Sequence, residues 1–69
     1  MIDATWEHAT RNGLEFYRLM QGGKSIAAIV RDNETRAAII ATGDLTAEVI
    51  GDTLELNKKT ARDMLAANK

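Results

Sequence analysis

The sequence of 69 residues contains no cysteine, no proline and a single histidine, His8. Without cysteine the chain forms neither a disulfide nor a thiolate zinc site, and one imidazole excludes a histidine-rich metal centre. No apolar run approaches the roughly 18 to 20 residues of a membrane-spanning helix, and the N-terminal residues lack the features of a signal peptide. We therefore expect a cytoplasmic protein with no cofactor, no metal and no membrane association.

The groups that catalysis requires are also scarce. Enzymes need a nucleophile with a base, paired carboxylates in a cleft, or a metal. His8 fits an ordinary strand residue better than a general base, and Glu7 and Glu15, which would face each other across a first hairpin, fit solvated strand positions. The sequence contains no phosphate-binding loop, dinucleotide fingerprint or calcium loop. We expect the protein to bind a partner rather than to catalyse a reaction.

Charge is nearly balanced but unevenly distributed. Residues 32–55 contain six acidic side chains and one basic side chain, whereas residues 56–69 contain four basic side chains and one acidic side chain. Two solvated faces of opposite sign explain this pattern most simply, and a charged binding surface is the alternative.

Short segments rich in β-branched and aromatic residues lie between glycine-containing turns. Asn12-Gly13 and Gly22-Gly23 suit tight hairpin turns, which require positive φ. These turns predict strands at about 4–9, 14–20, 24–31 and 36–42. Asn57 would cap a helix over about 58–67, and residues 45–51 fit either a fifth strand or a helix. The apolar stripe of the predicted helix is Ala61, Met64 and Leu65.

The third and fourth predicted strands are apolar on both faces, since alternate residues of a strand point to opposite sides. In the third strand Ile26, Ala28 and Val30 share one face and Ala27 and Ile29 the other, and in the fourth Ala38 and Ile40 oppose Ala37, Ile39 and Ala41. One short helix covers only one face of a sheet. We expect the second face to be buried in a homodimer or against a partner, the alternative being that small alanines tolerate exposure.

Five features follow one another along the chain: Trp6, Asn12-Gly13, Tyr17-Arg18-Leu19, Gly22-Gly23-Lys24 and Ile26-Ala27-Ala28-Ile29. Their order resembles that of small phage-encoded β-meander proteins that end in one helix, among them anti-CRISPR and other anti-defence inhibitors. The resemblance implies an α+β fold in a single domain over residues 1–69, with a four- or five-stranded antiparallel meander and one C-terminal helix. It also implies a non-enzymatic inhibitor that covers a surface of its protein target.

Such an inhibitor would meet its target through an aromatic anchor, nearby arginines and the acidic middle of the chain. Phe16 and Tyr17 are adjacent and face opposite sides of a strand, so one fills the core and the other is available as an anchor. The acidic side chains would meet a basic, nucleic-acid-binding groove of the target. The candidate partner-binding residues are Tyr17, Arg18, Arg31, Asp32, Glu34, Asp44, Glu48 and Asp52.

A second resemblance covers residues 36–67, which are similar to a helix-turn-helix. Residues 46–54 would form its first helix, residues 55–57 the turn and residues 58–67 the recognition helix, with residues 36–41 in a preceding helix. This alternative implies a mainly α-helical transcriptional regulator that binds DNA as a dimer. Its phosphate and base contacts would come from Lys58, Lys59, Thr60, Arg62 and Asn68.

Overall fold

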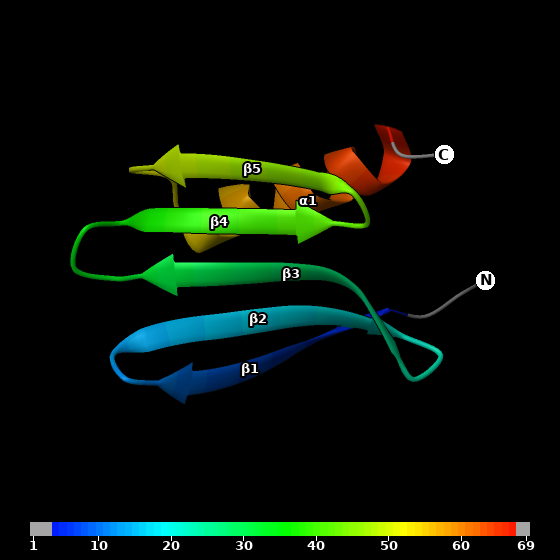
Figure 1. The fold of residues 1–69 in the computed structure, drawn as a ribbon, viewed down its shortest axis with the longest axis horizontal. Helices are drawn as coiled ribbons and strands as arrows, with labels where there is room; N and C mark the ends of the chain where they lie inside the picture. Colours follow the sequence, from blue (N-terminus) through cyan, green and yellow to red (C-terminus); the bar gives the residue numbers. More distant parts are fainter. Residues whose placement is uncertain (1–3, 68–69) are drawn as a thin grey trace.

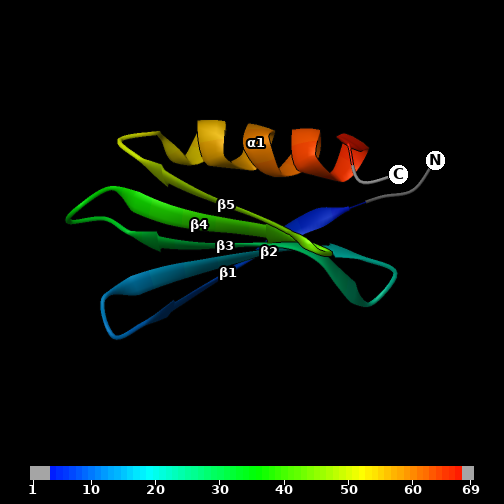
Figure 2. The ribbon, with the colours of Figure 1, turned by 45° about the horizontal axis from the view of Figure 1, so that its top comes forward.

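The structure is a computed structural model that describes residues 4–67. Five strands form one antiparallel sheet in the order of the sequence, and a single helix lies across one face of it (Figures 1 and 2). The predicted α+β meander with one C-terminal helix is confirmed. The elements are β1 (Thr5–Arg11), β2 (Leu14–Gln21), β3 (Lys24–Asp32), β4 (Ala37–Thr42), β5 (Leu45–Ile50) and α1 (Leu54–Ala67).

Two of the hairpins close through two-residue turns with positive φ, as expected from their sequences. Asn12 and Gly13 have φ of 53° and 79°, and Gly22 and Gly23 have 59° and 81°. This geometry matches the twist of the flanking strands. The turn between β3 and β4 is longer. There Arg36 itself takes φ of 60° and its N–H donates to the carbonyl of Asp32 at 2.8 Å, so β4 begins one residue later than predicted.

An irregularity in the pairing of β2 with β3 changes the expected face of one residue. Leu19 is the Cα partner of Ala27 and Met20 is the partner of Ser25, which leaves Ile26 as the extra residue of a β-bulge. Ile26 packs against the core on the side of α1. The prediction that Ile26 shares a face with Ala28 and Val30 was therefore wrong, because the alternation of β3 shifts at the bulge.

The core lies between the sheet and α1, chiefly over β3 and β4. Ile29 and Ile40 are register partners at its centre, and neither is exposed to solvent. Small residues let the helix approach the sheet closely: Ala27, Ala38 and Ala61 are all buried. The helix stripe of Ala61, Met64 and Leu65 faces this core, as predicted.

The helix begins four residues earlier than the sequence predicted. The Thr53 hydroxyl accepts a hydrogen bond from the N–H of Leu56 at 3.3 Å, and the Thr53 carbonyl accepts from the N–H of Asn57 at 3.0 Å. Thr53 therefore caps the helix. Asn57, predicted as the cap, lies inside the first turn and is fully buried.

The helix-turn-helix interpretation is wrong. Residues 36–41 and 46–54, which that interpretation places in helices, lie mostly in β4 and β5, and these two strands pair with each other in the sheet. Pairing with β3 places Ile40 in the core, and Gly43-Asp44 closes the hairpin. In the described part of the chain α1 is the one helix, and it is too short and too polar to cross a membrane.

A side chain of the sheet fixes the start of α1. The guanidinium Nη1 of Arg31, in β3, donates to the carbonyl of Asp52 at 2.9 Å and to the buried Oδ1 of Asn57. Both acceptors lie at the point where the chain leaves β5 and enters the helix. A bond to a charged donor at a partly buried site is stronger than one between neutral groups. Arg31 thus holds the first turn of α1 against the sheet.

We predict that Arg31→Ala lowers the free energy of unfolding by about 2 kcal/mol, because it leaves the buried Asn57 oxygen without a donor. The double variant Arg31→Met with Asn57→Leu removes both polar groups and should lose less. Lys59→Ala, which removes the exposed pair with Asp63, is the control and should leave stability nearly unchanged. Urea unfolding at one protein concentration measures all three variants. Equal stability of Arg31→Ala and Lys59→Ala would contradict the role given to Arg31.

Candidate binding surface

The sheet face turned away from α1 has an apolar centre, and we call it the open face. Strand register aligns its side chains in three rows across the five strands. The rows are Arg11, Leu14, Asp32, Ala37 and Ile50; Ala9, Phe16, Val30, Ile39 and Glu48; and Glu7, Arg18, Ala28, Ala41 and Thr46. Ile39 is 47% exposed and Ile50 is 79% exposed. Apolar side chains thus occupy the middle of the face and charged ones lie mostly toward its edges.

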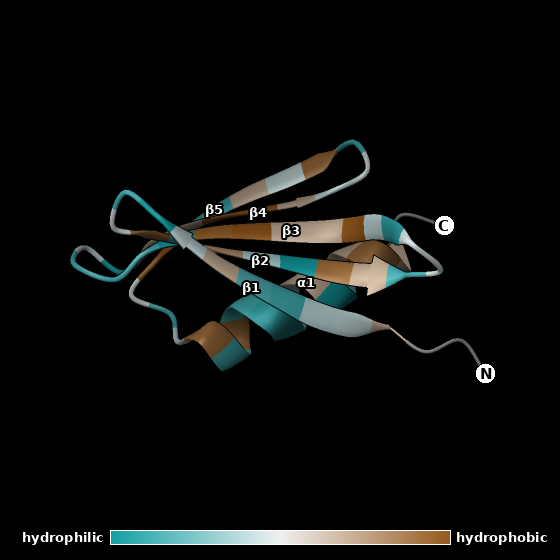
Figure 3. Cartoon of the chain, turned by 90° about the horizontal axis from the view of Figure 1, so that it is seen from below, coloured by the Kyte–Doolittle hydropathy of each residue, from teal (hydrophilic) through white to brown (hydrophobic). Residues whose placement is uncertain are grey.

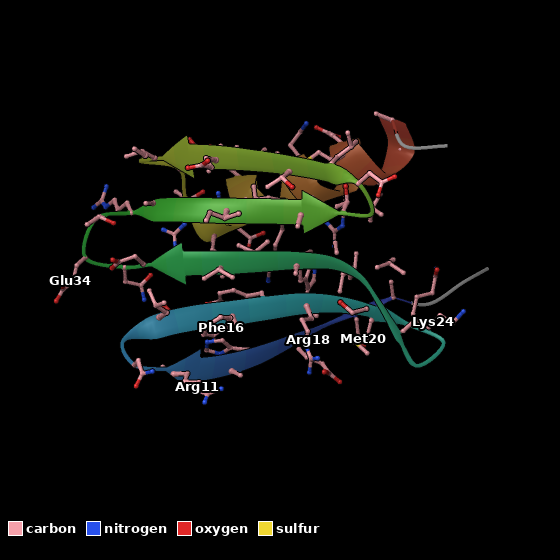
Figure 4. All side chains as sticks on the ribbon, in the orientation of Figure 1. Arg11, Phe16, Arg18, Met20, Lys24 and Glu34 are labelled. Atoms are coloured by element: carbon pink, nitrogen blue, oxygen red, sulfur yellow. The ribbon has the colours of Figure 1, made fainter. Side chains whose placement is uncertain are left out.

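The side chains of β1 and β2 on this face are drawn in Figure 4. Phe16, Arg18 and Met20 follow one another along β2 on the side away from α1, and Arg11 lies beside them on β1. The hydropathy of the strands changes across the sheet, from a mostly hydrophilic β1 to an apolar β3 (Figure 3). Phe16 is the aromatic residue of the open face and is half-buried there.

Two hollows indent the open face, one on each side of Val30, which lines both. One lies toward β4 and β5, and we call it the acidic hollow, since its charged lining residues are both acidic. The other lies toward β1 and β2, and we call it the basic hollow, since its charged lining residues are both basic. Facing the acidic hollow are Leu14, Val30, Asp32, Ile39, Glu48 and Ile50, and facing the basic hollow are Ala9, Arg11, Phe16, Arg18, Ala28 and Val30.

Such a face is unusual for a sheet exposed to water. An antiparallel sheet with one solvated side normally alternates apolar residues with polar ones. Here Val30 and Ile39 are register partners on the open face, while Ile29 and Ile40 are partners in the core. Contiguous apolar surface with a polar rim is typical of protein interaction sites. The open face is therefore the candidate functional site.

A polar cluster lies on the other face, beside the helix. The Glu15 carboxylate accepts a hydrogen bond from the Tyr17 hydroxyl at 2.8 Å and lies 2.9 Å from Nε2 of His8. The rings of His8 and Tyr17 stack, with centroids 4.5 Å apart and planes 4° from parallel. Burial raises the pKa of Tyr17, and the hydrogen bond to Glu15 raises it further. His8 and Glu15 line neither of the two hollows, and the cluster joins β1 to β2.

The sheet separates the two carboxylates that were expected to face each other across the first hairpin. Glu7 lies on the open face and pairs with Arg18, Oε1 to Nη2, at 3.4 Å. Glu15 lies on the helix side. It is the register partner of Thr10, which is three residues from Glu7 in β1 and therefore on the opposite face. Within residues 4–67 there is also no group of three or more metal-ligating side chains.

The structure separates the two adjacent aromatic residues, of which one was expected to fill the core. Tyr17 points toward α1 and is 8% exposed, so it belongs to the core, and Phe16 takes the open face instead. Arg31 also lies on the helix side, where Asp52 and Asn57 occupy its guanidinium. Arg18 lies on the open face, two residues along β2 from Phe16.

The acidic residues that are close in sequence do not form one surface. Asp32, Glu34 and Asp52 lie at the end of the sheet that carries the turn between β3 and β4, while Asp44 lies in the turn at the opposite end. Glu48 alone projects from the middle of a strand on the open face. An acidic surface spanning residues 32–55 is therefore absent, because the meander reverses the chain twice within that segment.

The basic residues of the tail are partly engaged by other side chains. Nζ of Lys58 lies 5.6 Å from the ring centroid of Trp6 and 5.9 Å from that of Tyr17, which are cation–π distances. Lys59 pairs with Asp63 at 2.9 Å. Of the other residues expected to contact DNA, Thr60 is half-buried, Arg62 is exposed and Asn68 lies outside the described residues.

Three apolar residues of the open face were not assigned to one surface from the sequence: Leu14, Phe16 and Ile50. Leu14 and Phe16 are two residues apart in β2, a spacing that places them on one side. Ile50 lies in the segment whose secondary structure was ambiguous, and its place follows only once β5 pairs with β4. The alternation of side chains along β2 was therefore the sequence signal that could have placed Leu14 and Phe16 on one surface.

We predict a pH dependence of stability that comes from Tyr17. Its pKa is raised in the folded state, so the protonated phenol is favoured there, and this contribution is lost as the pH rises through the raised pKa. The unfolding free energy of the wild type should fall relative to that of Tyr17→Phe as the pH rises above about 10, the pKa of an unperturbed tyrosine. Urea unfolding across that range measures both proteins. A constant difference between them at all pH values would contradict the raised pKa.

The candidate surface therefore draws residues from all five strands, and its assignment follows from the register of this sheet. In comparisons with known proteins, no protein-family model, no curated protein and no solved structure matches this chain.

Proposed function

We propose that this chain is a non-enzymatic protein-binding protein and that the open face is its binding surface. The observation that carries the proposal is a sheet with two apolar faces and a helix on only one of them. Binding of a partner removes the open face from water, just as α1 removes the opposite face of the sheet from water. Each large apolar side chain that becomes fully buried contributes about 1.5 to 3 kcal/mol.

The composition of the open face supports a protein partner over a nucleic acid. Its middle row holds four apolar residues, and its charges are of both signs. A nucleic-acid surface would instead be uniformly basic, because phosphate contacts dominate the affinity. The central anchor would be Phe16, with Ile39 beside it across Val30, since aromatic residues in the middle of an interface contribute most of the binding energy.

The mechanism that we propose is steric, as for the phage-encoded inhibitors that the order of features resembles. The open face is carried by hydrogen-bonded strands backed by a packed helix, so it loses little conformational freedom on binding. A partner surface covered by this face is no longer accessible to its own ligands. The charges around the two hollows would fix the orientation of the partner, since electrostatic complementarity gives specificity more than affinity.

Site-specific crosslinking tests the binding surface. A photoreactive benzoyl-phenylalanine replaces Ile39 on the open face, and in a matched control it replaces Leu56 on the helix. The two side chains have almost the same exposure, 47% and 48%. Irradiation of cells that express each variant should give protein adducts from position 39 and none from position 56. Adding Phe16→Ser to the first variant should weaken the adducts, because it removes the anchor.

Two results would refute this proposal. Equal labelling from positions 39 and 56 would show that adducts form at any exposed side chain and not specifically at the open face. An absence of adducts from position 39, in a protein whose circular dichroism shows the fold intact, would show that the face stays bare.

A further inference from the structure

We infer that the partner on the open face is a second copy of this chain, placed by a two-fold axis that runs along β3. This inference rests on the proposed function, since it names the occupant of that binding surface. It follows from the symmetry of the charges and of the apolar middle row about β3, and from the size of the exposed area.

The charges on the open face of one copy are complementary to those on the open face of a second copy. The basic hollow lies on the β1 side of Val30 and the acidic hollow on the β5 side. Rotation by 180° about an axis along β3, in the plane between two copies, places the basic hollow of each copy opposite the acidic hollow of the other. Such an isologous contact is the commonest arrangement in homodimers.

Two of the four charged lining residues are already engaged within one copy. Arg18 pairs with Glu7, and the Asp32 carboxylate accepts a hydrogen bond from the N–H of Glu34 at 2.9 Å, which holds it toward the turn. Arg11 and Glu48 remain as the charges of opposite sign at the two sides of the face. They lie in adjacent rows, on β1 and β5, and the two-fold rotation places β1 over β5 of the second copy. Each dimer then contains this contact twice.

The apolar rows fit the same rotation. In the middle row, Phe16 of β2 and Ile39 of β4 are each the immediate neighbour of Val30 in β3. The axis therefore places Phe16 of one copy opposite Ile39 of the other, and Val30 opposite Val30. An axis along β3 keeps the strands of the two copies nearly aligned, within the roughly 30° found between packed sheets, and their inner side chains interdigitate. The result is a two-layered β-sandwich with both α1 helices on the outside.

The exposed area matches what such a dimer buries. The chain exposes 4919 Å², whereas a folded monomer of 7.6 kDa exposes about 4,300 Å² on average. Removal of that excess of about 600 Å² from each copy gives a total of about 1,200 Å², the lower end of specific interfaces. The open face, with Ile39 and Ile50 exposed, is the apolar surface that such a dimer would bury.

Sedimentation of the purified full chain tests the inference. The wild type should have a mass of twice 7.6 kDa, and Ile39→Asp should give monomers because it places a charge opposite Phe16. Lys59→Glu, on the far side of the molecule, is the control and should remain a dimer. Far-UV circular dichroism establishes that each variant keeps the fold.

A charge exchange tests the axis. Arg11→Glu and Glu48→Arg should each weaken the dimer roughly tenfold or more at about 50 mM salt, because each places like charges together. An equimolar mixture of the two variants should form heterodimers, since each altered residue then meets an opposite charge. One chain that carries both substitutions should dimerise with itself.

The outcomes separate this inference from the proposed function. A wild type that stays monomeric overturns the second copy as partner, and adducts from position 39 to other proteins would then leave the open face as a surface for a foreign target. A dimer that persists in Ile39→Asp overturns the use of this face. A dimer without charge rescue overturns the axis along β3. Restored heterodimers together with the loss in Ile39→Asp establish the arrangement.

Discussion

A helix of fourteen residues covers one face of a five-stranded sheet and leaves the other to solvent or to a partner. This geometric constraint governs the rest of the molecule, because β3 and β4 are apolar on both sides. One side takes Ile29 and Ile40 out of water beneath α1, and the other presents Val30 and Ile39. The hydrophobic effect acts on both faces alike. Within residues 4–67 no second element covers the open face.

The choice of which face the helix covers depends on contacts near residue 52, where the chain leaves the sheet. Arg31 projects from β3 to the helix side and binds the carbonyl of Asp52 and the side chain of Asn57. Ala27, Ala38 and Ala61 then allow close packing, which offsets a core with few large side chains. A thin core of this kind is typical of small domains. The helix is thus fixed by a few polar contacts at its start and by apolar contacts along its length.

The fold was largely predictable from the sequence because its turns are strongly specified. Asn12-Gly13 and Gly22-Gly23 require positive φ, and both close two-residue hairpins. Residues 45–50 were ambiguous, since six residues satisfy both a period of two and a helical stripe, and only pairing with β4 decides between them. The helix start was misplaced because Asn57 is a good cap by type, whereas its amide is used by Arg31 inside the core. Local pattern could not supply that long-range contact.

The binding surface was harder to predict than the fold for one reason, the assignment of faces. Strand β2 is apolar on both sides, with Leu14, Phe16 and Met20 opposing Tyr17 and Leu19, so the strand alone does not say which aromatic is buried. Which of Phe16 and Tyr17 is buried depends on the face of the sheet against which α1 packs. Because side chains alternate, reversing the choice would exchange Phe16 with Tyr17 and move the charges of both hollows. The packing of α1 against the side of the sheet that carries Tyr17 and Leu19 therefore also determines that Phe16 lies on the open face.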